Sequence, residues 1–192
     1  MMPTQSEYPS AIIANVTLSQ LIVIDMQLKL AQAMPNDEMQ FAIKNNAILL
    51  QAAQLLAVPV ILTEQYPKGL GDTVPKLKPF LNNYLPIAKT AFSLADESKF
   101  IQQLSRDKSQ MIITGMEAHI CVLQAALDLI LKSKQVFVVE DAIVSRNPAN
   151  KANAVARMRE AGCVITNTES VVFEWLGNAN HAAFRAISTL IK

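Results

Sequence analysis

Cys121 is the residue of this sequence with the clearest potential for chemistry. It follows an apolar segment at residues 110–114 and a turn at residues 115–118, and it lies in the first turn of a predicted helix. Backbone N–H groups and the helix dipole stabilise an anion there, so we expect the thiol pKa to fall below its free value of about 8.5. The same N–H groups can bind a developing oxyanion. Cys121 is therefore a candidate nucleophile.

Two further residues become chemically relevant only if the fold brings them beside Cys121. Asp25 ends an apolar segment, and Lys89 follows a proline-rich one. A carboxylate can accept the thiol proton, and an ammonium favours both the carboxylate and the thiolate. Each residue also has a simpler interpretation: Asp25 as a cap or turn former, Lys89 as a solvated charge, and Cys121 as a packing residue on an apolar helix.

The elements that must position these residues alternate between strand and helix. Short apolar segments predict strands at residues 20–25, 59–64, 110–114, 135–140 and, more weakly, 163–167. Helical patterns occupy residues 37–57, 96–104, 119–134, 149–161, 169–176 and 180–191. Continuous apolar strands joined by helices predict an α/β fold, with a doubly wound, mostly parallel sheet flanked by helices on both faces. Ligands of such sheets bind at the carboxyl ends of the strands, where Asp25 lies.

Residues 65–90 interrupt this alternation. Residues that break helices recur there: Pro67, Gly69, Gly71, Pro75, Pro79 and Pro86. A segment of this kind covers a binding site in some proteins and is a plain surface excursion in others, and the sequence leaves both interpretations open.

Composition indicates a single soluble domain over residues 1–192, with residues 1–18 as an N-terminal extension. Hydrophobic residues make up 51% of the chain and charged residues 17%, so we expect part of the surface to be buried in a homo-oligomer. No apolar run approaches the ~18 to 20 residues that cross a bilayer. Residues 1–18 contain no Lys or Arg, which argues against a targeting leader and for a cytoplasmic location.

Charge and metal-ligand spacing exclude other classes of partner. Lys and Arg total 17 against 16 Asp and Glu, without a dense basic cluster, so nucleic acid is not an expected partner. His119 and His181 lack partners at ligand spacing, and we expect no metal and no cofactor. Cys163 begins a strand and is interpreted as core, not as half of a disulfide.

Three segments resemble, in order, the signatures of isochorismatase-like cysteine hydrolases. They are Asp25-Met26-Gln27, Lys89-Thr90-Ala91-Phe92-Ser93 and Gly115-Met116-Glu117-Ala118-His119-Ile120-Cys121-Val122. The resemblance runs from about Leu21 to the end of the chain. Residues 63–71, and Glu140-Asp141-Ala142 followed by Ser145-Arg146, further resemble the isochorismatase domain-containing branch of this family.

The resemblance implies a Rossmann-like topology and a catalytic triad of Asp25, Lys89 and Cys121. Asp25 would act as general base, Lys89 would hold the charges in place, and Cys121 would form a covalent acyl-enzyme with a small-molecule substrate. The backbone N–H groups of Glu117 and Cys121 would form the oxyanion hole, and the family pattern suggests a cis peptide between Met116 and Glu117.

Departures from related patterns narrow the expected reaction. Nicotinamidases of the superfamily carry an Asp-x-His metal motif after the second strand, where this chain has Glu64-Gln65-Tyr66-Pro67, so the resemblance supports no metal site. Isochorismatase proper cleaves a vinyl ether without depending on the Cys, and the Cys here favours an amide or ester substrate.

Aromatic faces and an amide suit a small planar ligand. The residues expected to surround the substrate are Gln27, Tyr66, Phe92 and Trp175, with His119 nearby, although Phe92 and Trp175 also suit an ordinary core. Two other functions remain open: a catalytically idle homo-oligomeric interaction protein, and a thiol redox sensor.

Overall fold

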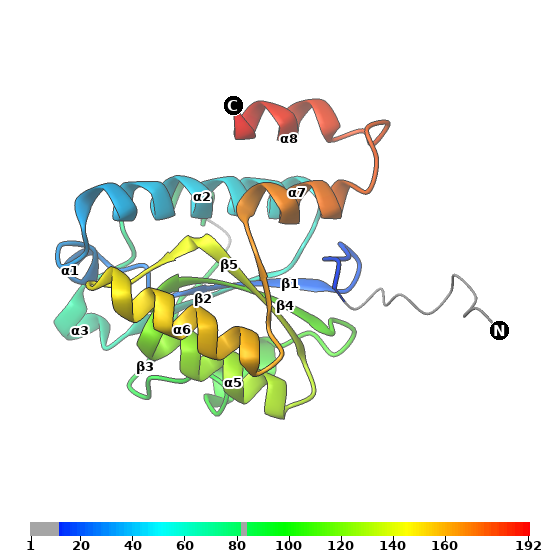
Figure 1. Ribbon diagram of the computed structural model, residues 1–192. Helices are drawn as coiled ribbons and strands as arrows, with labels where there is room; N and C mark the ends of the chain where they lie inside the picture. Colours follow the sequence, from blue (N-terminus) through cyan, green and yellow to red (C-terminus); the bar gives the residue numbers. More distant parts are fainter. Residues whose placement is uncertain (1–11, 82–83) are drawn as a thin grey trace.

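A single parallel sheet organises the protein (Figure 1). The computed structural model describes residues 12–81 and 84–192, and in this part of the chain the strand order is β3-β2-β1-β4-β5-β6. The strands are β1 (Ser19–Ile24), β2 (Val60–Gln65), β3 (Ile87–Lys89), β4 (Gln110–Met116), β5 (Gln135–Val144) and β6 (Val164–Thr166). The chain builds outward from β1 in both directions, and all five neighbouring pairs are parallel.

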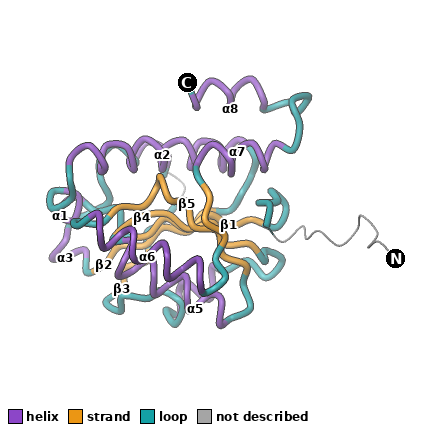
Figure 2. The backbone as a smooth tube through the Cα atoms, in the orientation of Figure 1, coloured by secondary structure: helices purple, strands orange, loops and turns teal. Residues whose placement is uncertain are grey.

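Helices cover both faces of this sheet. They are α1 (Leu28–Ala31), α2 (Asn36–Leu55), α3 (Pro67–Leu70), α4 (Ser98–Gln103), α5 (Leu123–Leu131), α6 (Pro148–Glu160), α7 (Thr168–Leu176) and α8 (Phe184–Ile191). A 3-10 helix, η1 (Lys78–Phe80), and a π-helix, η2 (Ala118–Val122), complete the described elements. Helices α2 and α7 lie on one face, α5 and α6 lie on the other, and α8 lies outside α2 and α7 (Figures 1 and 2). The predicted doubly wound α/β fold is confirmed.

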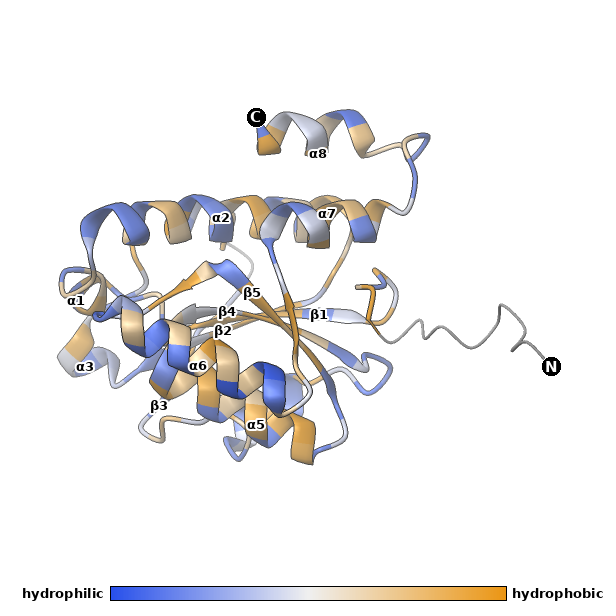
Figure 3. Cartoon of the chain, viewed as in Figure 1, coloured by the Kyte–Doolittle hydropathy of each residue, from blue (hydrophilic) through white to orange (hydrophobic). Residues whose placement is uncertain are grey.

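The sheet separates two apolar clusters. Leu21 and Val23 of β1 pack toward α2 and α7, whereas Ile22 and Ile24 pack toward α5 and α6. A central parallel strand is buried on both faces, so its residues are apolar in succession and do not alternate with polar ones, as the colouring of the strands in Figure 3 illustrates. The result is a rigid platform whose strands all end at the same edge.

The chain before β1 is attached to this platform. The Ala14 N–H donates to Glu174 Oε2 at 2.7 Å, and the Asn15 N–H donates to Gln110 Oε1 at 2.6 Å. Residues 1–11 of the predicted extension lie outside the described residues. No helix in the described part of the chain combines the length and apolar character that crossing a membrane requires.

Residues 65–90 contain more structure than the sequence indicated. They include α3, η1 and the edge strand β3, which pairs with β2 through Thr63 and Ile87. A strand of three residues with an exposed Ala88 at its centre has no apolar pattern of its own. Its conformation is set by the ladder with β2, which a local pattern cannot reveal.

Gly115 permits the closest approach between β1 and β4. It pairs with Ile24 in the β1–β4 ladder and has a φ of +117°. A Cβ added at this position would lie 2.0 Å from the carbonyl oxygen of Ile24. Only glycine accommodates both the positive φ and this contact, and the contact brings the turn after β4 beside Asp25.

We expect Gly115→Ala to reduce the free energy of unfolding by about 3 kcal/mol or more, because the new Cβ forces two central strands apart. Urea denaturation measures the effect. Gly162→Ala is the matched control, since Gly162 also has a positive φ of +98° but nothing within 4 Å of an added Cβ, and its loss should be about 1 kcal/mol. Equal losses in the two variants would show that the contact with Ile24 is unimportant.

Candidate active site

A buried ion pair lies at the carboxyl edge of the sheet. Asp25 follows β1, Lys89 ends β3, and Lys89 Nζ lies 2.7 Å from Asp25 Oδ2. Both side chains are 0% exposed. Removing two charges from water is costly, so the pair requires further hydrogen bonds to persist.

The strands around the pair supply these hydrogen bonds. Thr63 Oγ1 donates to Asp25 Oδ1 at 2.7 Å. Lys89 Nζ donates to Gln65 Oε1 at 2.6 Å and to the carbonyl oxygen of Phe92 at 3.0 Å, with the Ala91 carbonyl oxygen at 3.2 Å. Both charged groups are therefore held in fixed positions.

Cys121 completes the cluster from the other side of β1. It lies in η2, directly after β4, and is 5% exposed. Its thiol interacts with Asp25 and Lys89 both through their charges and through side-chain hydrogen bonding. Residues that are widely separated in the sequence thus meet because β3, β2, β1 and β4 are adjacent in the sheet. A π-helical turn is frequent at functional sites.

The electrostatics of the thiol differ from the sequence-based expectation. Burial raises the pKa of Cys121 to about 12, the negative charge of Asp25 also raises it, and Lys89 lowers it. The expectation of a lowered pKa is therefore wrong, because removal from water and a neighbouring carboxylate outweigh Lys89. Burial likewise raises the pKa of Cys163 to about 11. A pKa this far above neutrality favours the protonated, neutral form of the Cys121 thiol at neutral pH.

The turn that carries Cys121 has the backbone feature that the resemblance implied. The peptide bond between Met116 and Glu117 is cis. Further along the turn, His119 is half-buried, and its Nδ1 lies 3.0 Å from Ser145 Oγ. His119 therefore belongs to the turn beside the cluster, where it contacts the chain after β5.

Two of the expected pocket residues lie near Lys89 at the surface. Tyr66 and Phe92 are both exposed, and the Tyr66 N–H donates to the Lys89 carbonyl oxygen at 2.8 Å. Tyr66 lines a hollow of about 370 Å³ together with Pro67, Lys68, Ala88, Lys89, Thr90 and Glu97. The hollow therefore borders the end of β3, although the Lys89 side chain itself is 0% exposed.

The amide of Gln27 has a different role from the one expected. Gln27 is fully buried, and its Nε2 donates to the carbonyl oxygens of Gln65 at 3.0 Å and Gly71 at 2.7 Å. Its Oε1 accepts the Gln65 N–H at 2.8 Å. The side chain fastens the segment after β2 to the end of β1 and has no donor left for a ligand.

Trp175 lies away from the cluster. Its Nε1 donates to Ser19 Oγ at 2.9 Å, and Ser19 is the first residue of β1, at the opposite end of the strand from Asp25. The side chain is buried in the apolar cluster beneath α7. The core interpretation of Trp175 is therefore correct, and its assignment to the pocket is not.

Sequence reasoning missed Thr63 and Gln65 as parts of the site. Both lie at the carboxyl end of β2, and together they hydrogen-bond both members of the ion pair. The rule that led to Asp25, inspection of polar residues where a parallel strand ends, would also have identified them.

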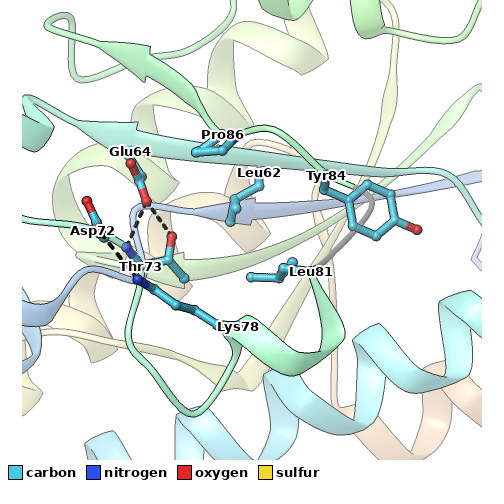
Figure 4. A pocket seen from close by; sticks show the side chains of 8 residues that line it. All are labelled: Leu62, Glu64, Asp72, Thr73, Lys78, Leu81, Tyr84 and Pro86. Atoms are coloured by element: carbon cyan, nitrogen blue, oxygen red, sulfur yellow. Dashed lines mark hydrogen bonds and ion pairs between the residues drawn. The ribbon is translucent and has the colours of Figure 1, made fainter.

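A second hollow, of about 390 Å³, borders β2 on its other side (Figure 4). Side chains alternate along a strand, so Glu64 points away from Thr63 and Gln65. The main-chain N–H and the Oγ1 hydroxyl of Thr73 both donate to Glu64 Oε1, each at 2.7 Å. Lys78 and Asp72 form an ion pair of 3.2 Å at the rim. These contacts anchor the segment that leads to β3.

Among residues 12–81 and 84–192, no group of three His, Cys, Asp or Glu side chains is arranged to hold a metal ion. The cluster itself presents a carboxylate, an ammonium and a thiol.

The fold and the buried cluster define an α/β protein whose site combines a carboxylate, an ammonium and a thiol. The Isochorismatase domain family matches residues 19–170, and the chain belongs to this family. The chain is 35% identical over 174 residues to isochorismatase domain-containing protein 2 of Bos taurus, covering 91% of this chain and 83% of that protein.

Solved structures agree with this membership. A protein called MAR1 ribonuclease from Caenorhabditis elegans superposes with a TM-score of 0.88 at 37% identity, covering 93% of this chain and 92% of that one. YcaC from Pseudomonas aeruginosa, described with hexane-2,5-diol and covalent acrylamide, superposes with a TM-score of 0.80 at 28% identity, covering 93% and 95%. Membership of the family supports a hydrolase.

The raised thiol pKa predicts the pH dependence of alkylation. A group with a pKa of about 12 is protonated at neutral pH, so the rate of iodoacetamide labelling at Cys121 should rise about tenfold per pH unit from about pH 7 to 10 without a plateau. In a Cys163→Ala variant, labelling that is quenched at set times and followed by mass spectrometry gives the alkylation rate of Cys121 alone. A plateau below about pH 8.5 would contradict the raised pKa.

Proposed function

We propose that the protein is a cysteine-dependent, metal-independent hydrolase of a small-molecule amide or related carbonyl bond, with Asp25, Lys89 and Cys121 as its catalytic residues. The observation that carries this proposal is the contact of one thiol with a fully buried carboxylate–ammonium pair. A cysteine that only packs the core does not need charged neighbours. A buried ion pair costs stability, and buried charged groups of this kind are frequent at functional sites.

The first half of the reaction is acylation. Cys121 Sγ attacks the substrate carbonyl carbon while its proton moves to Asp25, and a tetrahedral oxyanion forms. The carbon–nitrogen or carbon–oxygen bond then breaks, and the proton on Asp25 passes to the leaving amine or alcohol. The product of this half is a thioester on Cys121.

The second half is hydrolysis of the thioester. Asp25, again ionised, takes a proton from water, and the resulting hydroxide attacks the thioester carbon. The carbon–sulfur bond breaks, the proton returns to sulfur, and a carboxylic acid leaves. Lys89 stays beside the sites of proton transfer, because its hydrogen bonds to Asp25, Gln65 and the Phe92 carbonyl oxygen hold the ammonium in place.

The backbone N–H groups of Glu117 and Cys121 act as the oxyanion hole in this proposal. Two preorganised donors in a site shielded from water stabilise the negative charge of the tetrahedral intermediate, and loss of one such donor typically costs a factor of about 100 to 1,000 in rate. Tyr66 and Phe92, exposed beside Lys89, flank the entrance for substrate.

The descriptions of two relatives bear on the proposed chemistry. The acrylamide described as covalent for Pseudomonas aeruginosa YcaC is an electrophile to which nucleophiles such as thiols add at the alkene carbon, so it supports a reactive nucleophile in that relative and does not identify a substrate class. The Caenorhabditis elegans relative is called a ribonuclease. RNA is the less favoured substrate here, because the net charge of this chain is +1 and charged residues are 17% of its composition.

Cys121→Ala should abolish turnover of an amide or ester found by screening a small-molecule library, with a loss of about 1,000-fold or more because no nucleophile remains. Cys163→Ala is the matched control, because Cys163 is equally buried but its pKa is raised by burial and not by a charged neighbour. The Cys163→Ala variant should retain turnover. Liquid chromatography of the products measures both variants.

Other outcomes of this screen identify the alternative functions. Full turnover by Cys121→Ala would refute the nucleophile assignment. Cys121-dependent cleavage of an RNA oligomer would show that the substrate bond is a phosphodiester and not an amide. Absence of turnover together with reversible modification of Cys121 by peroxide would favour a redox sensor, and absence of both would favour an idle interaction protein.

We also propose that the enzyme works as a homo-oligomer in the cytosol. Large hydrophobic side chains lie exposed on α2 (Phe41), on α5 (Leu131) and in the segment before β3 (Leu85). The two cysteines are free thiols, as suits a reducing compartment. Light scattering at micromolar concentration should give a mass that is a multiple of the 21.1 kDa chain. A strict monomer would refute the oligomer.

A further inference from the structure

The chain after β5 lies beside the turn that carries the nucleophile. In the β4–β5 ladder, Met116 pairs with Val144, so the residues that follow each strand are neighbours. Glu117 therefore faces Arg146, and His119 faces Ser145. Both contacts therefore join the segment after β4 to the segment after β5, beyond the edge of the sheet.

Arg146 holds the carboxylate of Glu117 from two sides. The Arg146 main-chain N–H donates to Glu117 Oε2 at 3.0 Å, and Arg146 Nε lies 3.1 Å from both carboxylate oxygens. The Glu117 side chain is 5% exposed, whereas that of Arg146 is 58% exposed. A nearly buried carboxylate with two charge-assisted contacts has little conformational freedom, and these contacts also restrict the backbone that carries it.

A second contact fixes the same turn nearer to the nucleophile. His119 Nδ1 lies 3.0 Å from Ser145 Oγ, and Ser145 is fully buried. The turn between β4 and Cys121 is thus attached to the end of β5 at residues 117 and 119. Ser145 and Arg146 both follow Val144, the last residue of β5.

We propose that Arg146 is a positioning residue that aims the Glu117 N–H at the substrate oxyanion. This inference rests on the proposed function, because it requires an acyl-transfer reaction at Cys121. A misplacement of about 1 Å in a catalytic group can cost about 100-fold in rate, so a side chain that fixes the Glu117 backbone affects the reaction without touching the substrate.

The role predicts an effect on one reaction of Cys121 and not on another. Acylation by an ester develops negative charge on the carbonyl oxygen, which the Glu117 N–H stabilises. Alkylation by iodoacetamide forms a carbon–sulfur bond and releases iodide, and no oxyanion develops. Loss of Arg146 should therefore slow acylation while leaving alkylation unchanged.

The test compares Arg146→Ala with the wild-type full-length chain. With p-nitrophenyl acetate as acyl donor, the release of p-nitrophenolate in the first turnover should be about 10-fold slower in the variant. The rate of iodoacetamide labelling at about pH 9 should stay within about twofold of the wild-type rate. Arg157→Ala, which removes an exposed arginine of α6, is the matched control and should change neither rate.

Each remaining result overturns a specific statement. Equal acylation by Arg146→Ala and wild type refutes the positioning role. A matching fall in alkylation shows a general disturbance of the site and also refutes it. Arg146→Lys keeps the charge but not the Nε contact with both carboxylate oxygens of Glu117, so its acylation rate should be intermediate. Acylation by Arg146→Lys at the full wild-type rate would show that charge alone is sufficient and would refute the role of the Nε contact. Acylation that persists in Cys121→Ala refutes the proposed function itself.

Discussion

The buried ion pair between Asp25 and Lys89 is the constraint on which the rest of the site depends. Two charged side chains that are entirely removed from water lose hydration worth several kcal/mol each, and one hydrogen bond between them does not restore it. Thr63, Gln65 and the carbonyl oxygen of Phe92 supply the remaining contacts. Polar residues at the ends of three neighbouring strands thus all hydrogen-bond within this one ion-pair cluster.

The same pair makes a thiol with a raised pKa compatible with the proposed mechanism. Before the proposed reaction the cluster holds a carboxylate, an ammonium and a neutral thiol. If the proton moves from Cys121 to Asp25 as proposed, the cluster holds an ammonium, a thiolate and a neutral acid, so its net charge is unchanged. Burial opposes the loss of the thiol proton to solvent, but it does not oppose transfer to a carboxylate in the same environment.

The position of Cys121 comes from irregular backbone where the sheet ends. Gly115 lets β4 approach Ile24 more closely than any side chain would allow, and the turn that follows leads directly into η2 with Cys121. Within the sheet, the β4–β5 register shifts between Ile113 and Gly115, and Thr114 Oγ1 donates to Asn46 Oδ1 of α2. The helix layer therefore supports the strand where its regular pairing is interrupted.

Much of the fold was predictable from local patterns. The strands that became β1, β2, β4, β5 and β6 are runs of apolar residues, and the longer helices follow them in order. Strand β3 was not predictable, because three residues with an exposed centre take their conformation from β2. Gln27 and Trp175 were assigned to the pocket by residue type alone, whereas their roles depend on partners distant in the sequence.

The sequence by itself determined the order of the longer strands and helices, and with it the positions of Asp25 and Cys121 at or just beyond strand ends. Only the tertiary structure decided that β3 forms, that Lys89 pairs with Asp25, that Gln65 and Thr63 support the pair, and that the thiol pKa rises. The longer elements have local patterns that reveal them, but an edge strand, an ion pair and a pKa depend on burial and on distances between residues that only the folded sheet brings together.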